Sequence, residues 1–343
     1  MQDAFSRRIN YLRISITDRC NLRCVYCMPG QCAFFPKGDI LTYDEILRLC
    51  AIMAQLGVDI FRVTGGEPLV RPGCVDFIRR LKTIPGAKKV TLTTNGVLLG
   101  QYIHGLVAAG IDGINVSLDS ANRENYAKIT GLGASGDLSA FGDRSVSDDL
   151  GAFGDRDVFD RVWASIKEAV ACGVPTKINT VIIKGVNDHE ILPMVAMAEK
   201  LPIKVRFIEL MPTQANTAMA GLSNETVLQV LAKEYKDLTP DSGIYGDGPA
   251  RYYQSKRLLG KVGFISPMGH NFCESCNRLR LSAIGFLLLC LHHQKGLDLR
   301  RLLREGQDDD AIKRAIVQGI LEKPQRHLLE SETNLPDMSK VGG

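Results

Sequence analysis

Tyr11-Leu-Arg-Ile-Ser-Ile-Thr-Asp-Arg-Cys20-Asn-Leu-Arg-Cys24-Val-Tyr-Cys27 is the stretch that decides the fold. β-branched and apolar side chains alternate with polar ones over residues 11–17, which predicts a strand. Three closely spaced cysteines follow that strand directly. In parallel βα folds the functional groups collect where the strands end. We therefore expect a cysteine site at the carboxyl end of the first strand.

Further strand-like runs follow, and helical patterns with apolar residues at i, i+3 and i+4 separate them. Repeated βα units predict an α/β protein with a parallel sheet, either open and doubly wound or curled into a partly closed barrel. Thr42 and Glu45 form a capping-box pattern at the start of one helix. The predicted strands are 11–17, 59–64, 90–94, 113–118, 177–183 and 204–210, and the predicted helices are 43–56, 74–83, 98–109, 159–171, 189–200 and 225–236.

Polar and glycine-rich motifs stand at the ends of four more predicted strands. They are Thr-Gly-Gly-Glu-Pro at 64–68, Thr-Thr-Asn-Gly at 93–96, Ser-Leu-Asp at 117–119 and Glu-Leu-Met-Pro at 209–212. Each motif alone is typical of an ordinary turn. Together they predict that one rim of the sheet carries the functional site.

The composition is that of an ordinary globular chain: 343 residues, 45% hydrophobic, 23% charged and a net charge of +4. The first ten residues carry no apolar signal segment, and the longest apolar run, 286–291, is too short to cross a bilayer. We therefore expect a cytoplasmic protein whose reduced cysteines bind metal or do chemistry, with no membrane partner. The small charge and the lack of a basic patch with interleaved aromatic residues argue against a nucleic-acid partner.

Six of the ten cysteines form two groups of three: Cys20, Cys24 and Cys27, and Cys273, Cys276 and Cys290. Three thiolates are one short of the four that a structural zinc site or a stable Fe–S cluster usually takes. A cuboidal 4Fe–4S cluster on three cysteines leaves one iron open, where a small chelating ligand can bind. Of the other four cysteines, Cys50 and Cys172 lie in apolar helical patterns, Cys74 lies in a loop or helix start, and Cys32 follows the first group. We expect Cys50 and Cys172 to be buried packing residues.

Residues 131–157 interrupt the βα rhythm with a Gly-, Ser- and Asp-rich segment that contains Leu-x-Ala-Phe-Gly-Asp-Arg at 138–144 and again at 150–156. We expect a flexible surface insertion there. After residue 212 the βα rhythm fades. The predicted division is therefore a barrel over residues 1–212 and a second region over 213–343 that covers the rim.

The first cysteine group, with Tyr26 before its last member, and the motif Gly65-Gly66-Glu67-Pro68 resemble the radical S-adenosylmethionine (SAM) enzymes. That resemblance implies a partial (βα)6 TIM-like barrel and a 4Fe–4S cluster on Cys20, Cys24 and Cys27, whose open iron chelates SAM. The residues that it implies for SAM contacts are Tyr26, Gly66, Ser117 and Met211.

The second group and its surroundings are similar to the GTP 3′,8-cyclase family of molybdenum cofactor biosynthesis. The matching stretches are Cys273-Glu-Ser-Cys276-Asn-Arg278-Leu279-Arg280 with Cys290, the start at 13–20 and the final Gly342-Gly343. The resemblance implies a second 4Fe–4S cluster whose open iron holds guanine, and a basic site for the triphosphate. It assigns GTP contacts to Arg13, Arg62, Thr93, Lys177, Arg278, Leu279 and Arg280, and support of the reaction to Gly342 and Gly343.

In that family a 5′-deoxyadenosyl radical from SAM removes hydrogen from C3′ of GTP, and the C3′ radical attacks C8 of guanine. An electron and a proton then give 3′,8-cyclo-7,8-dihydro-GTP. The implied partners are GTP, SAM, an electron donor and the downstream cyclic pyranopterin monophosphate synthase, with the chain acting as a monomer or a homodimer. Three rivals stay open. One is a structural zinc site on the second group with His292 or His293. The others are a radical enzyme that acts on a peptide and an Fe–S regulator that binds nucleic acid.

Overall fold

The structure is a computed structural model that describes residues 1–28, 33–132, 155–269, 272–293 and 295–327. In these residues twelve strands form one sheet in the order β12-β11-β10-β1-β2-β3-β4-β5-β6-β9-β8-β7. The strands are β1 Tyr11–Ser15, β2 Ile60–Thr64, β3 Lys89–Thr94, β4 Ile114–Ser117, β5 Thr176–Ile182, β6 Lys204–Glu209, β7 Thr239–Asp241, β8 Arg251–Gln254, β9 Lys261–Ile265, β10 Arg278–Leu281, β11 Phe286–Leu288 and β12 Gly296–Asp298.

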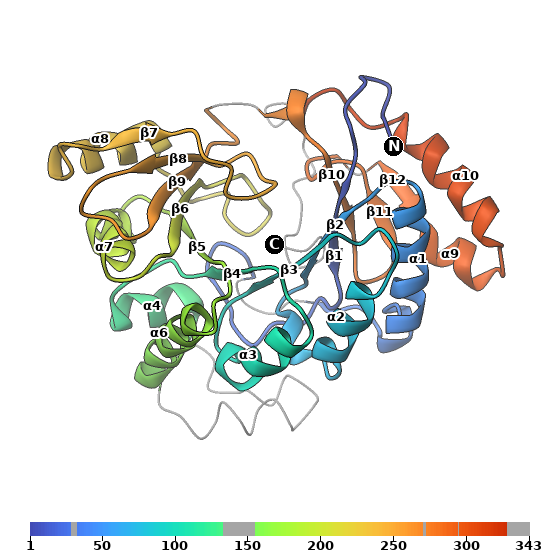
Figure 1. The fold of residues 1–343 in the computed structure, drawn as a ribbon, viewed down its shortest axis with the longest axis horizontal. Helices are drawn as coiled ribbons and strands as arrows, with labels where there is room; N and C mark the ends of the chain where they lie inside the picture. Colours follow the sequence, from blue (N-terminus) through green and yellow to red (C-terminus); the bar gives the residue numbers. More distant parts are fainter. Residues whose placement is uncertain (29–32, 133–154, 270–271, 294, 328–343) are drawn as a thin grey trace.

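Helices cover the outer face of the curled sheet (Figure 1). They are α1 Tyr43–Gln55, α2 Cys74–Lys82, α3 Leu99–Ala108, α4 Arg123–Thr130, α6 Asp155–Ala171, α7 Ile191–Lys200, α8 Asn224–Glu234, α9 Leu299–Arg304 and α10 Asp309–Ile320, with short 3-10 turns at η1 Lys37–Asp39, η2 Pro68–Val70, η4 Asp188–Glu190 and η5 Cys273–Ser275. The predicted capping box is confirmed, since Thr42 accepts a hydrogen bond from the Glu45 amide and Glu45 accepts one from the Thr42 amide. No helix in the described ranges is long and apolar enough to span a membrane.

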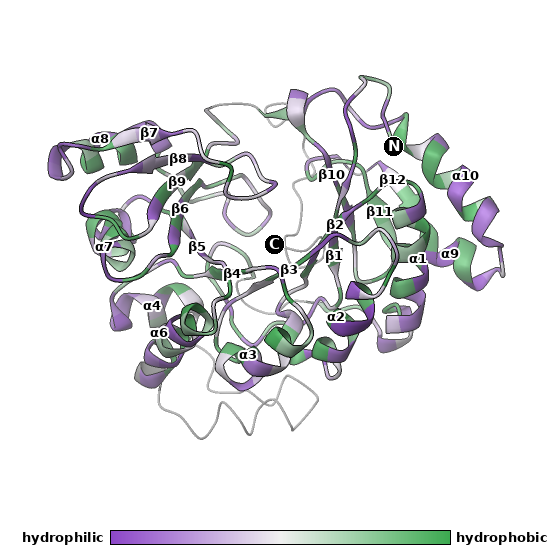
Figure 2. Cartoon of the chain, in the orientation of Figure 1, coloured by the Kyte–Doolittle hydropathy of each residue, from purple (hydrophilic) through white to green (hydrophobic). Residues whose placement is uncertain are grey.

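Strands β1 to β6 are parallel and in register, as the βα pattern predicts. Their outward side chains, such as Leu12, Phe61 and Phe207, are fully buried in one core between the sheet and the helices. Figure 2 shows this division, with hydrophobic colour along the strands and hydrophilic colour on the outer surfaces of the helices. The inward side chains of the same strands are largely polar. The interior of the curl is therefore the place where this chain gathers its charged and polar groups.

Residues after Met211 extend the sheet at both of its edges. Strand β10 pairs in parallel with β1, and β9 pairs in parallel with β6. The sequence does not predict these strands, because each of the six strands after β6 has only three to five residues and no helical crossover marks it. Helix α4 is likewise absent from the predicted elements, and α6 begins at Asp155, four residues before the predicted start at 159. Residues 133–154, which make up most of the predicted insertion, lie outside the described residues.

Candidate active site

Two adjoining cavities open on the inner face of the sheet, and each contains one of the cysteine groups. The first cavity is lined by Cys20, Cys24 and Cys27, and the second cavity by Cys273, Cys276 and Cys290. Five residues line both cavities: Arg13, Asn179, Ile208, Met211 and Arg280. The two groups, far apart in sequence, therefore face a continuous interior.

The first cysteine group lies in a tight loop after β1. The amides of Cys27 and Met28 both donate to the Cys24 carbonyl, at 3.0 and 2.9 Å, so the chain turns sharply at the second cysteine. Burial raises the pKa of Cys20 to about 11 and also raises the pKa of Cys24. Thiols that are this costly to ionise on their own are deprotonated when a metal binds them.

The residues present suit a polynuclear cluster at each group. Among the described residues, no three His, Cys, Asp or Glu side chains converge closely enough to hold a single metal ion. The three cysteines of each group instead line the wall of one cavity. They are close enough for the charge of one thiolate to shift the pKa of another. A single zinc needs sulfurs at about 2.3 Å from one point, whereas an iron–sulfur cube separates its cysteine ligands.

Close backbone packing explains why glycines stand at positions 65 and 66, after β2. A Cβ atom on Gly66 would collide with the carbonyl of Arg19, and one on Gly65 would lie 2.7 Å from the carbonyl of Thr17. The amides of Gly66 and Glu67 donate to these same two carbonyls, each at 2.8 Å. The glycines therefore let two backbone segments meet beneath the cysteine loop.

Glu67, the acidic member of the same motif, ties the end of β2 to the end of β3. Its carboxylate accepts hydrogen bonds from the Leu69 amide at 3.0 Å, the Thr94 hydroxyl at 2.8 Å and the Asn95 amide at 2.6 Å. Burial raises the pKa of Glu67 to about 7. These hydrogen bonds indicate that Glu67 holds the ends of β2 and β3 in place at the rim of the sheet.

All four predicted SAM contacts, Tyr26, Gly66, Ser117 and Met211, line the first cavity. The Tyr26 hydroxyl donates to Asp119 at 2.6 Å, and Asn216 donates to the Met211 carbonyl at 3.0 Å. Burial raises the pKa of Asp119 to about 6. Sequence patterns point to 117–119 as a strand-end motif but do not single out Asp119 as the partner of Tyr26.

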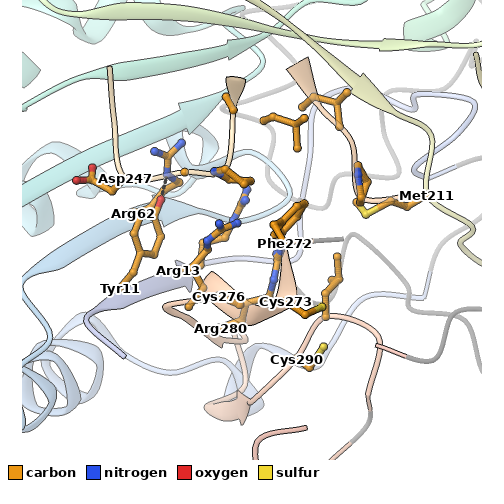
Figure 3. A pocket seen from close by; sticks show the side chains of 18 of the residues that line it. Tyr11, Arg13, Arg62, Met211, Asp247, Phe272, Cys273, Cys276, Arg280 and Cys290 are labelled. Atoms are coloured by element: carbon orange, nitrogen blue, oxygen red, sulfur yellow. Dashed lines mark hydrogen bonds between the residues drawn. The ribbon is translucent and has the colours of Figure 1, made fainter. Parts of the chain in front are cut away.

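Three arginines stand side by side across the inner face of the sheet. Arg13 on β1 is in register with Arg62 on β2 and with Arg280 on β10. In Figure 3 Arg62 lies toward Asp247 at one side of the second cavity, and Arg280 lies near the cysteines. Burial lowers the pKa of Arg280 to about 10, and burial together with Arg280 and Arg62 lowers that of Arg13. Half-buried cations that share one cavity indicate a site for an anion.

The remaining predicted GTP residues fall around this row. Lys177 and Arg278 line the second cavity, and Thr93 lines the first cavity, where its hydroxyl accepts from Arg62 at 3.4 Å. Burial, followed by the charge of Arg206, lowers the pKa of Lys177 to about 7. Leu279 pairs with Leu12 and its side chain is fully buried in the outer core, so it has only its backbone to offer a ligand.

Arg206 on β6 is a further cation of the second cavity that the sequence prediction missed. One of its terminal nitrogens donates to the side-chain oxygens of Asn115 and Asn179, and its buried Nε has no partner among the described residues. Its signal in the sequence was the alternation of Lys204 and Arg206 with apolar residues along a predicted strand. That alternation places both side chains on the inner face.

The second cysteine group is surrounded by positive charge. Lys323 is buried and donates to the carbonyls of Arg278 and Leu289, and Arg7 donates to the Cys273 carbonyl at 2.9 Å. Burial alone would raise the pKa of Cys276, but the charges of Lys323, Arg278 and Arg7, together with a backbone hydrogen bond from Arg278, outweigh it and lower that pKa. Neither Arg7 nor Lys323 is part of a recognisable motif.

Comparison with known proteins agrees with these observations. The family described as Radical SAM superfamily matches residues 14–198, and that described as Molybdenum Cofactor Synthesis C matches residues 203–329. The chain is 38% identical over 347 residues to the GTP 3′,8-cyclase of Clostridium perfringens and 41% identical over 349 residues to that of Pelotomaculum thermopropionicum, with 100% of each chain covered in both cases. The chain belongs to the GTP 3′,8-cyclase family.

A solved structure of low sequence identity shares this fold. A crystal structure of Streptococcus suis SuiB bound to S-adenosylmethionine superposes with a TM-score of 0.61 over 95% of this chain and 75% of that one. At 14% identity this likeness shows the fold alone. The predicted partial barrel of the radical SAM type is thus confirmed, and the family carries SAM and an iron–sulfur cluster.

Some predicted residues lie elsewhere. Cys32, Gly342 and Gly343 are outside the described residues. Cys50 is fully buried, as predicted, and Cys74 is buried at the start of α2. Cys172 packs against the core, as predicted, but it is only partly buried. It follows the end of α6, and its sulfur lies 3.9 Å from Nδ1 of His104. Because α6 ends at Ala171, where the predicted helix also ends, Cys172 falls in the turn that follows.

Proposed function

We propose that this chain converts GTP to 3′,8-cyclo-7,8-dihydro-GTP by radical SAM chemistry, the first step of molybdenum cofactor biosynthesis. The observation that supports it most strongly is the continuous interior, in which two half-buried arginines, Arg13 and Arg280, line both of the cavities that each carry three cysteines. Membership of the GTP 3′,8-cyclase family over the whole chain supports the same reaction.

Cys20, Cys24 and Cys27 would hold the cluster that binds SAM. When bound, this cluster and SAM would together supply a 5′-deoxyadenosyl radical that removes hydrogen from C3′ of GTP; C3′ would then bond to C8, and an electron from the donor and a proton would complete the product. Tyr26, Gly66, Ser117 and Met211 would surround SAM, and the hydrogen bond from Tyr26 to Asp119 would fix the tyrosine against it.

Cys273, Cys276 and Cys290 would hold a second 4Fe–4S cluster, whose open iron would take the guanine of GTP. The fit rests on the three thiols around the second cavity and on the lowered pKa of Cys276, which favours the thiolate form. This proposal replaces the zinc alternative, in which His292 or His293 would be a fourth ligand.

The side chains of the protein would bind GTP, orient it and shield it from solvent. Arg13, Arg62, Thr93, Lys177, Arg278, Leu279 and Arg280 are the proposed GTP contacts, to which the structure adds Arg206. Their guanidinium groups carry hydrogen-bond donors in the fork geometry that phosphate oxygens accept. Gly342 and Gly343 are proposed to support the reaction from the carboxyl terminus.

The wider setting is part of the same proposal. We propose a cytoplasmic enzyme that takes its electron from a separate donor and passes its product to a cyclic pyranopterin monophosphate synthase, as a monomer or a homodimer. Residues 1–212 would form the barrel, 213–343 would carry the second cluster and the GTP site, and 131–157 would be a dispensable insertion.

The test is product analysis after anaerobic incubation of the reconstituted chain with SAM, GTP and a reductant. We expect 5′-deoxyadenosine and cyclised GTP to form together. Cleavage of SAM that never yields cyclised GTP, together with turnover of a peptide substrate, would overturn the proposal. Cyclisation by a chain that contains zinc and a single cluster's worth of iron would overturn the second-cluster part alone.

A further inference from the structure

The amino ends of the barrel strands carry four lysines: Lys89 on β3, Lys177 on β5, Lys204 on β6 and Lys261 on β9. The last three are in register across neighbouring strands. Because side chains alternate along a strand, Lys89 shares the inner face of β3 with Thr91 and Thr93. The end of the interior away from the cysteine loop after β1 is therefore ringed by ammonium groups.

The loop between β7 and β8, residues 242–250, covers this ring and is here named the β7–β8 loop. Asp247 forms an ion pair with Lys89 at 2.7 Å, and the ring of Tyr245 lies 5.0 Å from the Lys204 ammonium. Gly246 lies directly against the Lys177 ammonium, so that a Cβ atom there would be 2.5 Å from Nζ. Tyr245, Gly246 and Asp247 of the loop thus each lie against a different lysine.

The β7–β8 loop is also a wall of the second cavity. Its residues from Gly246 to Ala250 line that cavity together with Arg62, Lys177 and Arg206. Among the described residues that line the second cavity, Asp247 is the sole carboxylate. Figure 3 shows its side chain beside Arg62 and Tyr11, at the side of the cavity away from Cys290.

The side chain of Lys89 is much less exposed than that of its neighbour Lys88. The neighbouring Lys88 pairs with Asp59, and its side chain is 74% exposed, whereas the side chains of Lys89 and Asp247 are 34% and 26% exposed. The charge of Lys89 also contributes to the lowered pKa of Lys177, after burial and the charges of Arg206 and Arg62. Lys89 therefore belongs electrostatically to the cavity.

We propose that Lys89 is a further GTP-binding residue that contacts the terminal phosphate, and that in the GTP-free chain the Asp247 carboxylate occupies the position of that phosphate beside Lys89. The inference rests on the proposed function. A terminal phosphate carries more negative charge than one carboxylate, so GTP displaces Asp247 and a shorter nucleotide leaves the pair intact. Lys89 and Asp247 thus make the site selective for the triphosphate.

The orphaned groups nearby fit an anion at this end. The Nε of Arg206 and the hydroxyl of Thr91, both more than nine-tenths buried, have no hydrogen-bond partner among the described residues. Arg206 lines the second cavity, and Thr91 stands between Lys89 and Thr93 on β3. Buried donors without a partner are costly unless a ligand satisfies them.

The experiment is equilibrium binding of GTP and of GDP to the full reconstituted chain and to four variants. Lys89→Met should weaken GTP binding about tenfold and GDP binding less than about twofold, because it removes one charge-assisted contact to the last phosphate. Lys89→Arg should restore most of the GTP affinity. Asp247→Asn should tighten GTP binding about threefold, because it removes a competing anion. Lys88→Met, the matched control, should bind both nucleotides like the unaltered chain.

Equal losses of GTP and GDP affinity in Lys89→Met, or weaker GTP binding in Asp247→Asn, would overturn the inference. Retained SAM cleavage by each variant shows that the variant is folded. The unaltered chain separates this failure from a failure of the proposed function: if it neither binds nor cyclises GTP, the proposed function fails, and if it does both while Lys89→Met matches it, only this inference fails.

Discussion

The first and second cavities contain the same number of cysteines but differ in charge: the first has two carboxylates beside the two arginines that it shares with the second, whereas the second has mainly cations. The first is lined by the carboxylates of Asp119 and Glu209, and the second by Arg62, Lys177, Arg206, Arg278 and Lys323. Burial raises the pKa of Cys20 and Cys24 in the first group and of Cys290 in the second, whereas Cys276 in the second group has a pKa that nearby cations lower. The same ligand pattern is thus placed in two different electrostatic environments.

This difference matches the charges of the two proposed ligands. SAM carries a sulfonium and an ammonium group, which carboxylates favour, and GTP carries about four negative charges, which buried arginines favour. Arg13 and Arg280 line both cavities and so stand where the two ligands would meet. The two cavities would therefore have separate roles: the first would bind SAM, the source of the radical, and the second would bind the substrate GTP.

The largest expected effect separates the two cysteine groups. Cys24→Ala should abolish both SAM cleavage and cyclisation, because the first cavity loses a ligand of the cluster that binds SAM. Cys276→Ala should keep part of the SAM cleavage and lose the cyclised product. The measurement is simultaneous quantification of 5′-deoxyadenosine and cyclised GTP. Full-rate cyclisation by Cys276→Ala would show that the second group has no part in the reaction.

A large effect is also expected from Gly66→Ala, because its methyl group collides with the backbone of Arg19 below the first cysteine loop. Iron content should fall toward that of one cluster, and SAM cleavage should fall on the order of a hundredfold. Gly38→Ala is the control, since nothing lies within 4 Å of a Cβ atom there. An active Gly66→Ala with full iron would mean that the close approach is not needed for the loop.

Ligand binding in the second cavity should weaken as the pH rises. Lys177 has a pKa lowered to about 7 and binds GTP in its cationic form, so it loses its proton as the pH rises through 7 in the GTP-free chain. GTP affinity should therefore fall on the order of tenfold between pH 6.5 and 8.5. Lys177→Arg should flatten that decline, because arginine keeps its charge. The same decline in Lys177→Arg would assign it to another group.

The smallest effect is expected from the insertion. Deleting residues 133–154 keeps Gly131 and Leu132, and with them the hydrogen bond from the Arg23 amide to the Thr130 carbonyl at 2.9 Å, which joins α4 to the first cysteine loop. Cyclisation should stay within about twofold of the unaltered rate. A folded deletion variant without activity would show that the segment has a function.

Sequence periodicity predicted the six parallel strands well, because each has a buried outer face and a helical crossover that mark it. It could not predict β7 to β12, which are short and are specified by the edges that they join. The register of Arg62, Arg13 and Arg280 depends on one of these joins, since β10 pairs with β1. The row of arginines is therefore a property of the folded sheet.

The cysteines, the glycine pair and the basic motif after Cys276 could be found because their spacing is local. Arg206, Asp119, Arg7 and Lys323 could not, because each acts through a partner distant in the chain: Arg206 through Asn115, Asp119 through Tyr26, Arg7 through the Cys273 carbonyl and Lys323 through the Arg278 carbonyl. Leu279 shows the converse. It lies between two cavity residues in the sequence, yet its side chain points into the outer core.

The most direct test of the separate roles of the two cavities is equilibrium binding of GTP and of SAM to Arg206→Met under anaerobic conditions. Arg206 lines the second cavity and is not among the residues that line the first. We predict that GTP binds at least about tenfold more weakly, because a buried charged donor to the phosphates is lost, while the affinity for SAM is unchanged. Equal weakening of SAM and GTP binding, or unchanged binding of GTP, would contradict the account.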